Sequence, residues 1–389
     1  FYSPSVLKWP HYHKEASYMI NRDRLLDTFL DYVRIDSEST HEGAIAARVA
    51  EDLQAIGCQV DLDDTQAQTG SDTGNLYCTL PGTAPGQPIL LSAHLDTVIP
   101  GTGVEPVLEN GVIRSKGDTV LGSDDKAGVA AIVEALRSLV EQRLPHPPVQ
   151  AVFTVCEEIG LRGSRHLDDS RILAKQAVVL DSDGDAGRII TSAPGQYQIT
   201  ARITGRRAHA GVAPEEGISA IQVAAEAISQ MRLLRVDQET TANIGSVSSQ
   251  YATNIVPEVL DLAAEARSRD AEKLERQAEH MAQCLRHACE KYGAALDIQM
   301  SKAYSPFSIP SEDSFLRAVM AACERVGLTP SLSATGGGSD ANNMNAHGIK
   351  ALVLGVGMSK VHTTQEEISV QNLVDTASLV LSLITDEAP

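Results

Sequence analysis

The fold is indicated most clearly by the run Pro88-Ile-Leu-Leu-Ser-Ala-His94-Leu-Asp96, in which an apolar, strand-like stretch ends at a histidine and an aspartate. Two other apolar runs end in a similar way, 149–155 before Glu157-Glu158 and 177–180 before Asp181. In an open α/β sheet the carboxyl ends of parallel strands meet at one crevice, where ligands bind. We therefore expect these acidic and imidazole side chains to lie together.

Helix-like and strand-like segments alternate around this run. Apolar residues recur with a helical period at 25–33 and at 42–56, and strands are expected near 58–62 and 75–80. Such alternation is typical of a sheet whose two faces are covered by helices, and it favours a largely parallel sheet. The first part of the chain, residues 19–194, is therefore predicted to form an α/β domain.

The middle of the chain has a different order of predicted strands and helices. After residue 195 the pattern runs strand, helix, strand, strand, helix, strand, which is the ferredoxin-like plan. These segments are predicted at 198–204, 218–233, 242–247, 259–266, 271–292 and 296–301. From about residue 306 the helix–strand alternation returns, and it ends in a helix at 370–385. We therefore predict an α+β ferredoxin-like domain at 195–305, inserted into a mainly parallel α/β domain made of 19–194 and 306–389.

Composition excludes several kinds of partner. A chain of 389 residues exceeds what one core usually supports, so two domains are expected. The formal charge of −19 disfavours nucleic acid and anionic membranes, which need a basic face. No apolar stretch approaches the roughly 20 residues that cross a bilayer.

Six cysteines without CxxC spacing favour a cytoplasmic location. Residues 1–18 lack the plan of a signal peptide, and we interpret them as an N-terminal extension.

The residues at the ends of the strands are suited to metal binding. His94 and Asp96 lie on the same side of an extended segment, so the carboxylate can accept a hydrogen bond from the imidazole and fix its tautomer. Glu157-Glu158 emerges from a buried strand, where paired carboxylates are costly without a metal or a proton. Asp181 and His362 also follow apolar runs. Taken alone, each of these residues is more often an ordinary loop or turn residue than a metal ligand.

A further pair of carboxylates precedes a predicted helix at 129–140. In Gly122-Ser-Asp124-Asp125-Lys126 the acidic residues could simply cap this helix, but adjacent carboxylates repel each other unless a cation lies beside them. Two divalent ions bring four positive charges, which Asp124, Glu158, Asp181 and one hydroxide would balance. Imidazole and carboxylate ligands without cysteine suit zinc, and also manganese or cobalt. The sequence thus predicts a site for two divalent metal ions.

The glycine-rich segment Thr335-Gly-Gly-Gly-Ser-Asp340 could be mistaken for a phosphate-binding loop. It lacks the Gly-Lys-Ser/Thr ending of that motif, and no clear strand precedes it. Its glycines would instead permit the close approach of a peptide.

As a set, these motifs resemble those of a peptidase T-like member of the aminoacylase/carboxypeptidase superfamily of co-catalytic dizinc metallopeptidases. The resemblance extends from about residue 19 to the C-terminus, and it implies a zinc-hydrolase catalytic domain with a lid. It implies that His94 and Asp181 bind one metal and that Glu158 and His362 bind the other. Asp124 would bridge the two metals, often through a cis peptide to the next residue. Asp96 would orient His94, and Glu157 would be the general base.

The same resemblance suggests substrate contacts. His209, in Gly205-Arg-Arg-Ala-His209-Ala-Gly211, corresponds to a histidine that stabilises the developing oxyanion, sometimes from a partner subunit. Asn254 and Arg267 correspond to residues that bind polar ends of the substrate, although Arg267 is also compatible with a surface ion pair. Gly337 and Gly338 belong to the glycine loop that lines the substrate pocket in this family. Ser339 stands where many relatives carry threonine.

The implied activity is hydrolysis of amide bonds in short peptides through a metal-bridging hydroxide, and we expect an aminopeptidase of the tripeptidase type. An N-acyl-amino-acid amidohydrolase or desuccinylase, or a carboxypeptidase of the same superfamily, would keep every ligand and differ only in pocket lining. The insertion at 195–305 disfavours the related single-domain dizinc aminopeptidases. A metal-binding protein without turnover, or a scaffold, is a further alternative, but Glu157 argues against it. The lid could form a homodimer through an exposed edge strand.

Overall fold

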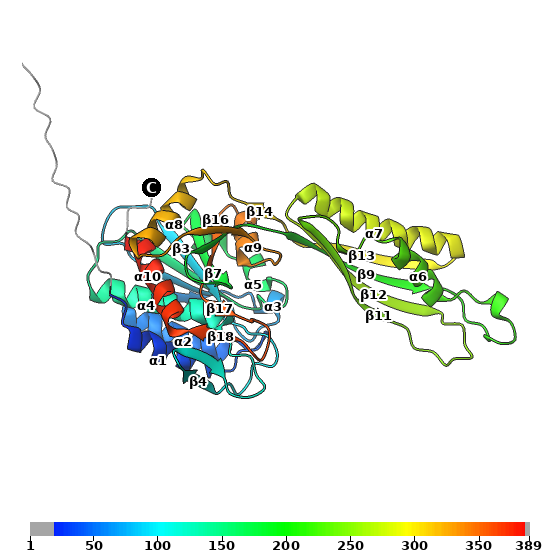
Figure 1. Ribbon diagram of the computed structural model, residues 1–389, viewed down its shortest axis with the longest axis horizontal. Coiled ribbons are helices and arrows are strands. Elements are labelled where there is room, and N and C mark those ends of the chain that lie inside the picture. Colours follow the sequence, from blue (N-terminus) through cyan, green and yellow to red (C-terminus); the bar gives the residue numbers. More distant parts are fainter. Residues whose placement is uncertain (1–18, 386–389) are drawn as a thin grey trace, which may run out of the picture.

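The computed structural model describes residues 19–385, so the predicted extension at 1–18 lies outside the described residues (Figure 1). A layered α/β body contains a nine-stranded sheet, and a second, antiparallel sheet extends from one side of it. The strands of the large sheet are β1 (Gln59–Leu62), β2 (Leu76–Leu80), β3 (Ile89–His94), β6 (Val149–Thr154), β7 (Gln176–Ser182), β8 (Arg188–Ala193), β14 (Phe307–Ser308), β15 (Ser331–Ala334) and β16 (Lys350–Gly355).

The centre of this sheet is parallel and its edges are mixed. The order is β1-β2-β6-β3-β7-β16-β8-β14, with β15 paired to β8. Neighbours among β6, β3, β7 and β16 run parallel, whereas β1, β2 and β14 pair with their neighbours antiparallel. The predicted parallel arrangement therefore holds for the four central strands, and the sheet as a whole is mixed. Because β3, β6 and β7 are parallel neighbours, their carboxyl ends lie at one edge, as the sequence predicts.

Helices cover both faces of the large sheet. One face packs against α1 (Arg22–Val33), α2 (Gly43–Ile56), α4 (Ser123–Glu141), α8 (Ser314–Arg325) and α10 (Val370–Thr385). The other face packs against α9 (Asp340–Ala346) and the segment around Leu167 and Ile172. The short helices of the body are α3 (Gln66–Thr69), α5 (Arg162–Arg165) and η1 (Asp169–Arg171). Another short helix, η2 (Pro214–Glu216), lies in the inserted unit.

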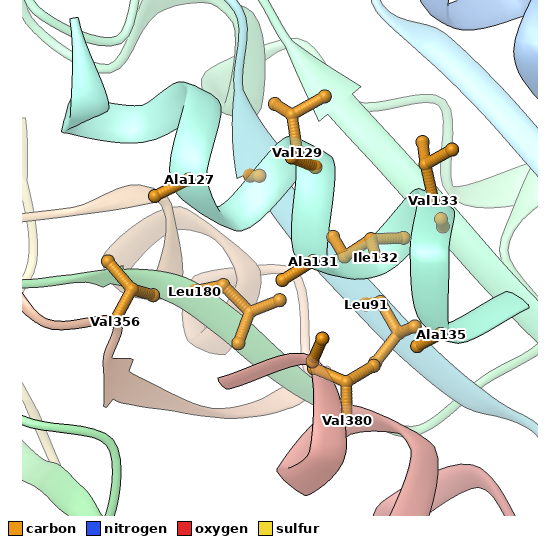
Figure 2. Packing of buried hydrophobic residues seen from close by; sticks show 14 of the residues in the cluster. Leu91, Ala127, Val129, Ala131, Ile132, Val133, Ala135, Leu180, Val356 and Val380 are labelled. Atoms are coloured by element: carbon orange, nitrogen blue, oxygen red, sulfur yellow. The ribbon is translucent and has the colours of Figure 1, made fainter. Parts of the chain in front are cut away.

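Helix α4 is buried in the core along most of its length, and its first turn carries Asp124. Figure 2 shows Ala131 and Ile132 of this helix beside Leu91 of β3 and Val380 of α10. Gly128 makes the close approach to the sheet, because a Cβ atom there would lie 2.5 Å from the carbonyl oxygen of Leu180. The start of α4 is thereby held against β7, next to the carboxyl ends of the central strands.

The inserted unit is an antiparallel sheet with two helices on one face (Figure 1). Its elements are β9 (Gly195–Thr204), α6 (Ala220–Gln230), β10 (Leu234–Arg235), β11 (Thr240–Ser248), β12 (Val259–Ser268), α7 (Ala271–Tyr292) and β13 (Ala295–Tyr304). The strand order β10-β11-β12-β9-β13 is the ferredoxin-like arrangement with the short β10 added at one edge. Ile199, Ala201 and Ile203 of β9 face the helices, so the alternating polar residues Gln196 and Gln198 face the open side.

A small third sheet carries the loop of His362. Its order is β17 (Met358–Ser359), β18 (Glu367–Ser369), β5 (Val112–Ser115) and β4 (Pro106–Glu109). The prediction that no clear strand precedes the glycine loop is wrong, because β15 of the large sheet lies directly before it. With only four residues, two of them serine, β15 is too short and too polar for its period to stand out. No helix within residues 19–385 combines the length and the apolar character that a membrane span requires.

Candidate metal centre

His94, the last residue of β3, is fully buried with its two ring nitrogens in different surroundings. Its Nδ1 lies 2.9 Å from the backbone oxygen of Asp96, and its Nε2 lies 3.0 Å from Oδ1 of Asp124 and 3.7 Å from Oδ1 of Asp181. The carboxylate of Asp96 is 3.5 Å from Nδ1, so the backbone carbonyl rather than the predicted carboxylate is the closer acceptor. Donation from Nδ1 to this carbonyl leaves Nε2 free to bind a cation.

The carboxylate of Asp96 holds the turn that follows β6. Its Oδ1 accepts from the backbone N–H of Glu157 at 2.9 Å. Its Oδ2 accepts from the backbone N–H of Glu158 at 3.2 Å and from the hydroxyl of Ser39 at 2.6 Å. Asp96 therefore fixes the backbone of the glutamate pair in addition to orienting His94, a connection that the sequence does not reveal.

Asp124 lies between two imidazoles. Its Oδ1 is 3.0 Å from Nε2 of His94, and its Oδ2 is 3.2 Å from Nε2 of His362. The Asp124–Asp125 peptide is cis, as the family resemblance implies. Although burial opposes ionisation, the two imidazoles hold the pKa of Asp124 well below its usual range. One carboxylate thus presents one oxygen to each half of the site.

His362 and Glu158 form the second half of the site. His362 lies in the loop between β17 and β18 with a φ of 60°, and Nε2 of its ring is 3.0 Å from Oε2 of Glu158. The carboxylates of Asp124 and Glu158 raise the pKa of His362 to about 10. The other oxygen of Glu158, Oε1, is buried and has no hydrogen-bond partner among the described residues. A buried carboxylate oxygen without a partner is expected where a cation binds.

The remaining carboxylates are crowded and desolvated. Burial raises the pKa of Asp181 to about 7. Burial, together with the nearby charge of Asp181, raises the pKa of Glu157 well above its usual value. Both effects are those of buried carboxylates crowded by neighbouring negative charge.

The donor atoms converge in two overlapping groups. In one group, His94, Asp124 and Glu158 each offer an atom within 4.8 Å of the others, and in the second, His94, Asp125 and Asp181 do so. The sequence did not predict Asp125 as a ligand. Its Oδ1 accepts from the backbone N–H of Gly128 at 3.2 Å, and its Oδ2 from that of His94 at 3.4 Å. Asp125 therefore supports the strand end and the helix behind the site. The cluster fits cations that take nitrogen and oxygen ligands.

A cavity of about 430 Å³ opens beside this cluster. From the body it is lined by Asp124, Glu157, Glu158, Asp181 and His362, and by Gly337 and Gly338 of the glycine loop; from the inserted unit it is lined by Gln196, Gln198, Arg267 and Tyr304. Gly338 packs directly on Tyr304, because a Cβ atom there would lie 2.4 Å from the ring.

Arg267 both faces the cavity and forms an ion pair. Its Nε and Nη2 donate to Glu265 at 2.9 and 3.0 Å, and this carboxylate also accepts from Gln196. Arg267 thus lines the cavity and also forms an ion pair, and its contact with substrate stays a prediction. Its Nη1 group has no acceptor in the part of the chain that the structure describes, so it remains for a second acceptor.

His209 and Asn254 do not line this cavity. The backbone N–H next to His209, that of Ala210, donates to the carbonyl of Asn254 at 2.9 Å, so the two predicted residues are neighbours. They follow the distal ends of the lid strands, and a ten-residue strand such as β9 spans about 30 Å. Both side chains are exposed, and within the described chain they are remote from the metal cluster.

Two buried acids near the site escaped the sequence prediction. Asp340, at the end of the glycine loop, accepts from the hydroxyl of Thr154, and its Oδ1 has no partner among residues 19–385. Glu366 accepts hydrogen bonds from the turn that carries Asp124. The only signal in the sequence is that each lies close to a predicted site segment.

Comparison with known proteins identifies the family. The profile of "Peptidase family M20/M25/M40" matches residues 90–386. The crystal structure of the aminopeptidase PepT from Bacillus cereus is similar, with 43% identity over 95% of this chain and 100% of that chain and a TM-score of 0.89. A Staphylococcus aureus tripeptidase is 39% identical over 94% of this chain and 98% of that chain, with a TM-score of 0.91. Peptidase T of Geobacillus kaustophilus is 25% identical over 93% of this chain and 98% of its own length. Together with the cluster of buried acids and imidazoles, these matches show that the chain belongs to peptidase family M20/M25/M40.

Proposed function

We propose that this protein is an aminopeptidase of the tripeptidase type that hydrolyses short peptides with the help of two divalent metal ions. The observation that carries the proposal is the position of Asp124, whose two oxygens face two different imidazoles beside the buried Glu157. The similar Bacillus cereus and Staphylococcus aureus proteins are described as an aminopeptidase and a tripeptidase, and both match nearly the full chain.

The distances between donor atoms support two ligand sets. His94, Asp124 and Asp181 would hold one ion, and Asp124, Glu158 and His362 the other. Both histidines would bind as neutral imidazoles through Nε2. When bound, two such ions lower the pKa of a water molecule and polarise the scissile carbonyl. The imidazole and carboxylate donors favour zinc, with manganese or cobalt as alternatives. Cys156 is not among the donors, because its thiol points to Glu42 at 3.3 Å.

The protein's own groups then move the proton and hold the peptide. Glu157 would take the proton of the attacking water on its carboxylate and pass it to the leaving amine. Its backbone is held by Asp96 at 2.9 Å, which keeps the carboxylate directed into the cavity. Arg267 would bind a polar end of the substrate through its free N–H groups. The backbone of Gly337 and Gly338 would line the opposite side of the pocket.

A second copy of the chain would complete the site. His209 and Asn254 are remote from the cavity, and the resemblance implies that such a histidine can reach the site from a partner subunit. We therefore propose a homodimer through the lid, whose edge strand β13 pairs on one side only within residues 19–385. Co-expression of Glu157→Gln and His209→Ala chains tests this arrangement. Activity well above that of either variant alone is expected, and no recovery in a proven mixed dimer would contradict it.

The substrate class is tested by a peptide screen. We expect the metal-loaded protein to cleave di- and tripeptides with a free amino terminus and to leave N-acylated peptides intact. Preference for the blocked peptides would favour the amidohydrolase or desuccinylase alternative. We also propose a cytoplasmic location and a lid that extends from residue 195 to residue 305. The six cysteines are all free and buried, which suits a reducing compartment.

A further inference from the structure

We propose that Glu366 is a positioning residue that fixes Asp124 and His362 relative to each other, so that the two halves of the metal site form together. This inference rests on the proposed metal-dependent function. Glu366 does not face the cavity, and its role is to hold the backbone that carries the ligands.

The carboxylate of Glu366 is enclosed by the turn that begins α4. Its Oε2 accepts from the backbone N–H groups of Leu121 and Gly122, each at 2.8 Å. Its Oε1 accepts from the hydroxyl of Ser123 at 2.5 Å and from the backbone N–H of Asp124 at 2.9 Å. The side chain is only 2% exposed. Four donors on four consecutive residues thus bind one carboxylate, and the last of them is the backbone of the proposed bridging ligand.

The same residue anchors the segment of the second histidine. Glu366 follows His362 by four positions, and its backbone N–H donates to Thr363 at 3.1 Å. Directly after it, β18 pairs with β5. The loop of His362 is therefore fastened at its carboxyl end both to the third sheet and to the turn of Asp124. His362 itself is half exposed and has a left-handed backbone, so it depends on this anchor for its position.

A carboxylate is required for this contact. Glutamine at 366 would keep one acceptor oxygen but would present an N–H₂ group to N–H and O–H donors. The Ser123 hydroxyl could turn to accept from this group, but at least one of the three backbone N–H donors would lose its partner in a buried place. The turn and the histidine loop would separate, and the distances from Asp124 to the two imidazoles would no longer be held.

Helix α4 provides a matched control. Glu134 is also buried, at 1% exposure, and it also accepts four hydrogen bonds: from Asn21, from two nitrogens of Arg24 and from Ser138. It ties α1 to α4 and does not line the cavity. Replacing it with glutamine removes a similar network from the same helix without touching a proposed ligand.

The test is a titration of metal-free wild type, Glu366→Gln and Glu134→Gln with Zn²⁺ and separately with Mn²⁺, with circular dichroism to verify folding. We expect wild type and Glu134→Gln to bind two ions alike. Glu366→Gln should bind at least one ion about 10- to 100-fold more weakly, the effect typical of groups that orient ligands. Unchanged affinities in Glu366→Gln, or an equal loss in Glu134→Gln, would overturn the inference.

Two further outcomes are separated by the design. If wild type binds no metal, the proposed function fails, independently of Glu366. If Glu366→Gln does not fold, Glu366→Asp decides, because it keeps both acceptor oxygens but withdraws them by one methylene. A folded Glu366→Asp with weakened binding at one or both ions supports the positioning role, and wild-type binding contradicts it.

Discussion

The body and the lid of this protein supply site residues in different ways. In the body, His94, the Glu157-Glu158 pair and Asp181 stand at or just after neighbouring parallel strands, and the structure brings them together. In the lid, Arg267 reaches the cavity, whereas His209 does not. Positions within one sheet are fixed by backbone hydrogen bonds. The contribution of a lid loop depends on how whole domains and subunits are arranged.

The largest effect on catalysis is expected from a substitution in the body. Glu157→Gln removes the proposed base but leaves all five proposed ligands. We expect kcat to fall by about 10²- to 10⁴-fold, since this is the typical contribution of a general base. Steady-state kinetics and metal content measured on the same sample test this. The exposed Glu105→Gln is the control, and near-normal activity of Glu157→Gln would show that another group accepts the proton.

A smaller effect is expected for the lid residue that does reach the cavity. Arg267→Ala should lower kcat/KM by about 10- to 100-fold, because a hydrogen bond to a charged group contributes about 1.5–3 kcal/mol. Arg202→Ala is a matched control, since Arg202 lies on the same open face of the lid and forms a similar bidentate pair with Asp261. Equal losses in both variants would mean that the lid is perturbed as a whole.

The contact between body and lid offers a third test. Gly338→Ala would place a methyl group 2.4 Å from the ring of Tyr304, so the glycine loop or the lid must shift. Overpacking of this kind costs about 1–3 kcal/mol and should lower the melting temperature together with kcat/KM. Gly336→Ala has nothing within 4 Å of the new Cβ and serves as the control. If the two variants behave alike, the contact does not shape the pocket.

The smallest effect concerns a charge in the body that is remote from the strand ends. Lys350 and the first turn of α8 hold the pKa of Asp313 below its ordinary value of 3.8, although partial burial opposes this. A lowered folded-state pKa stabilises the fold above about pH 4, and this stabilisation is lost as the pH falls further. Asp313→Asn keeps the cap but loses the charge.

We therefore expect Asp313→Asn to unfold about 0.2–1 kcal/mol more easily at pH 7, a range that allows for solvent screening of the half-exposed Lys350. The difference from wild type should shrink toward zero below pH 4, and kcat/KM should not change. Denaturant unfolding at several pH values measures it. A difference that grows at low pH would contradict the assignment.

The sequence predicts local elements well because their signals are local. The helix at 271–292 has the predicted bounds, since its apolar period, its cap Asp270 and Gly293 all lie within the segment. The site ligands of the body could be proposed because an apolar run ending in an acid or histidine is visible in the sequence. Parallel pairing then places those ends together.

Other features were out of reach because they depend on contacts between distant residues. Glu366 binds a turn that lies 242 to 245 positions away, and no local pattern reveals such a contact. Asp96 looked like a partner of His94 alone, yet its carboxylate holds the turn after β6. The distance of His209 from the cavity follows from the length and direction of the lid strands, which a motif does not encode.

The central claim is that one carboxylate, Asp124, joins two cation sites. The most direct measurement is anomalous diffraction from crystals grown with Zn²⁺. Two ions are predicted, one within about 2.0–2.2 Å of His94, Asp124 and Asp181, and the other at the same range from Asp124, Glu158 and His362. A single ion, or ions that Asp124 does not touch, would contradict this account.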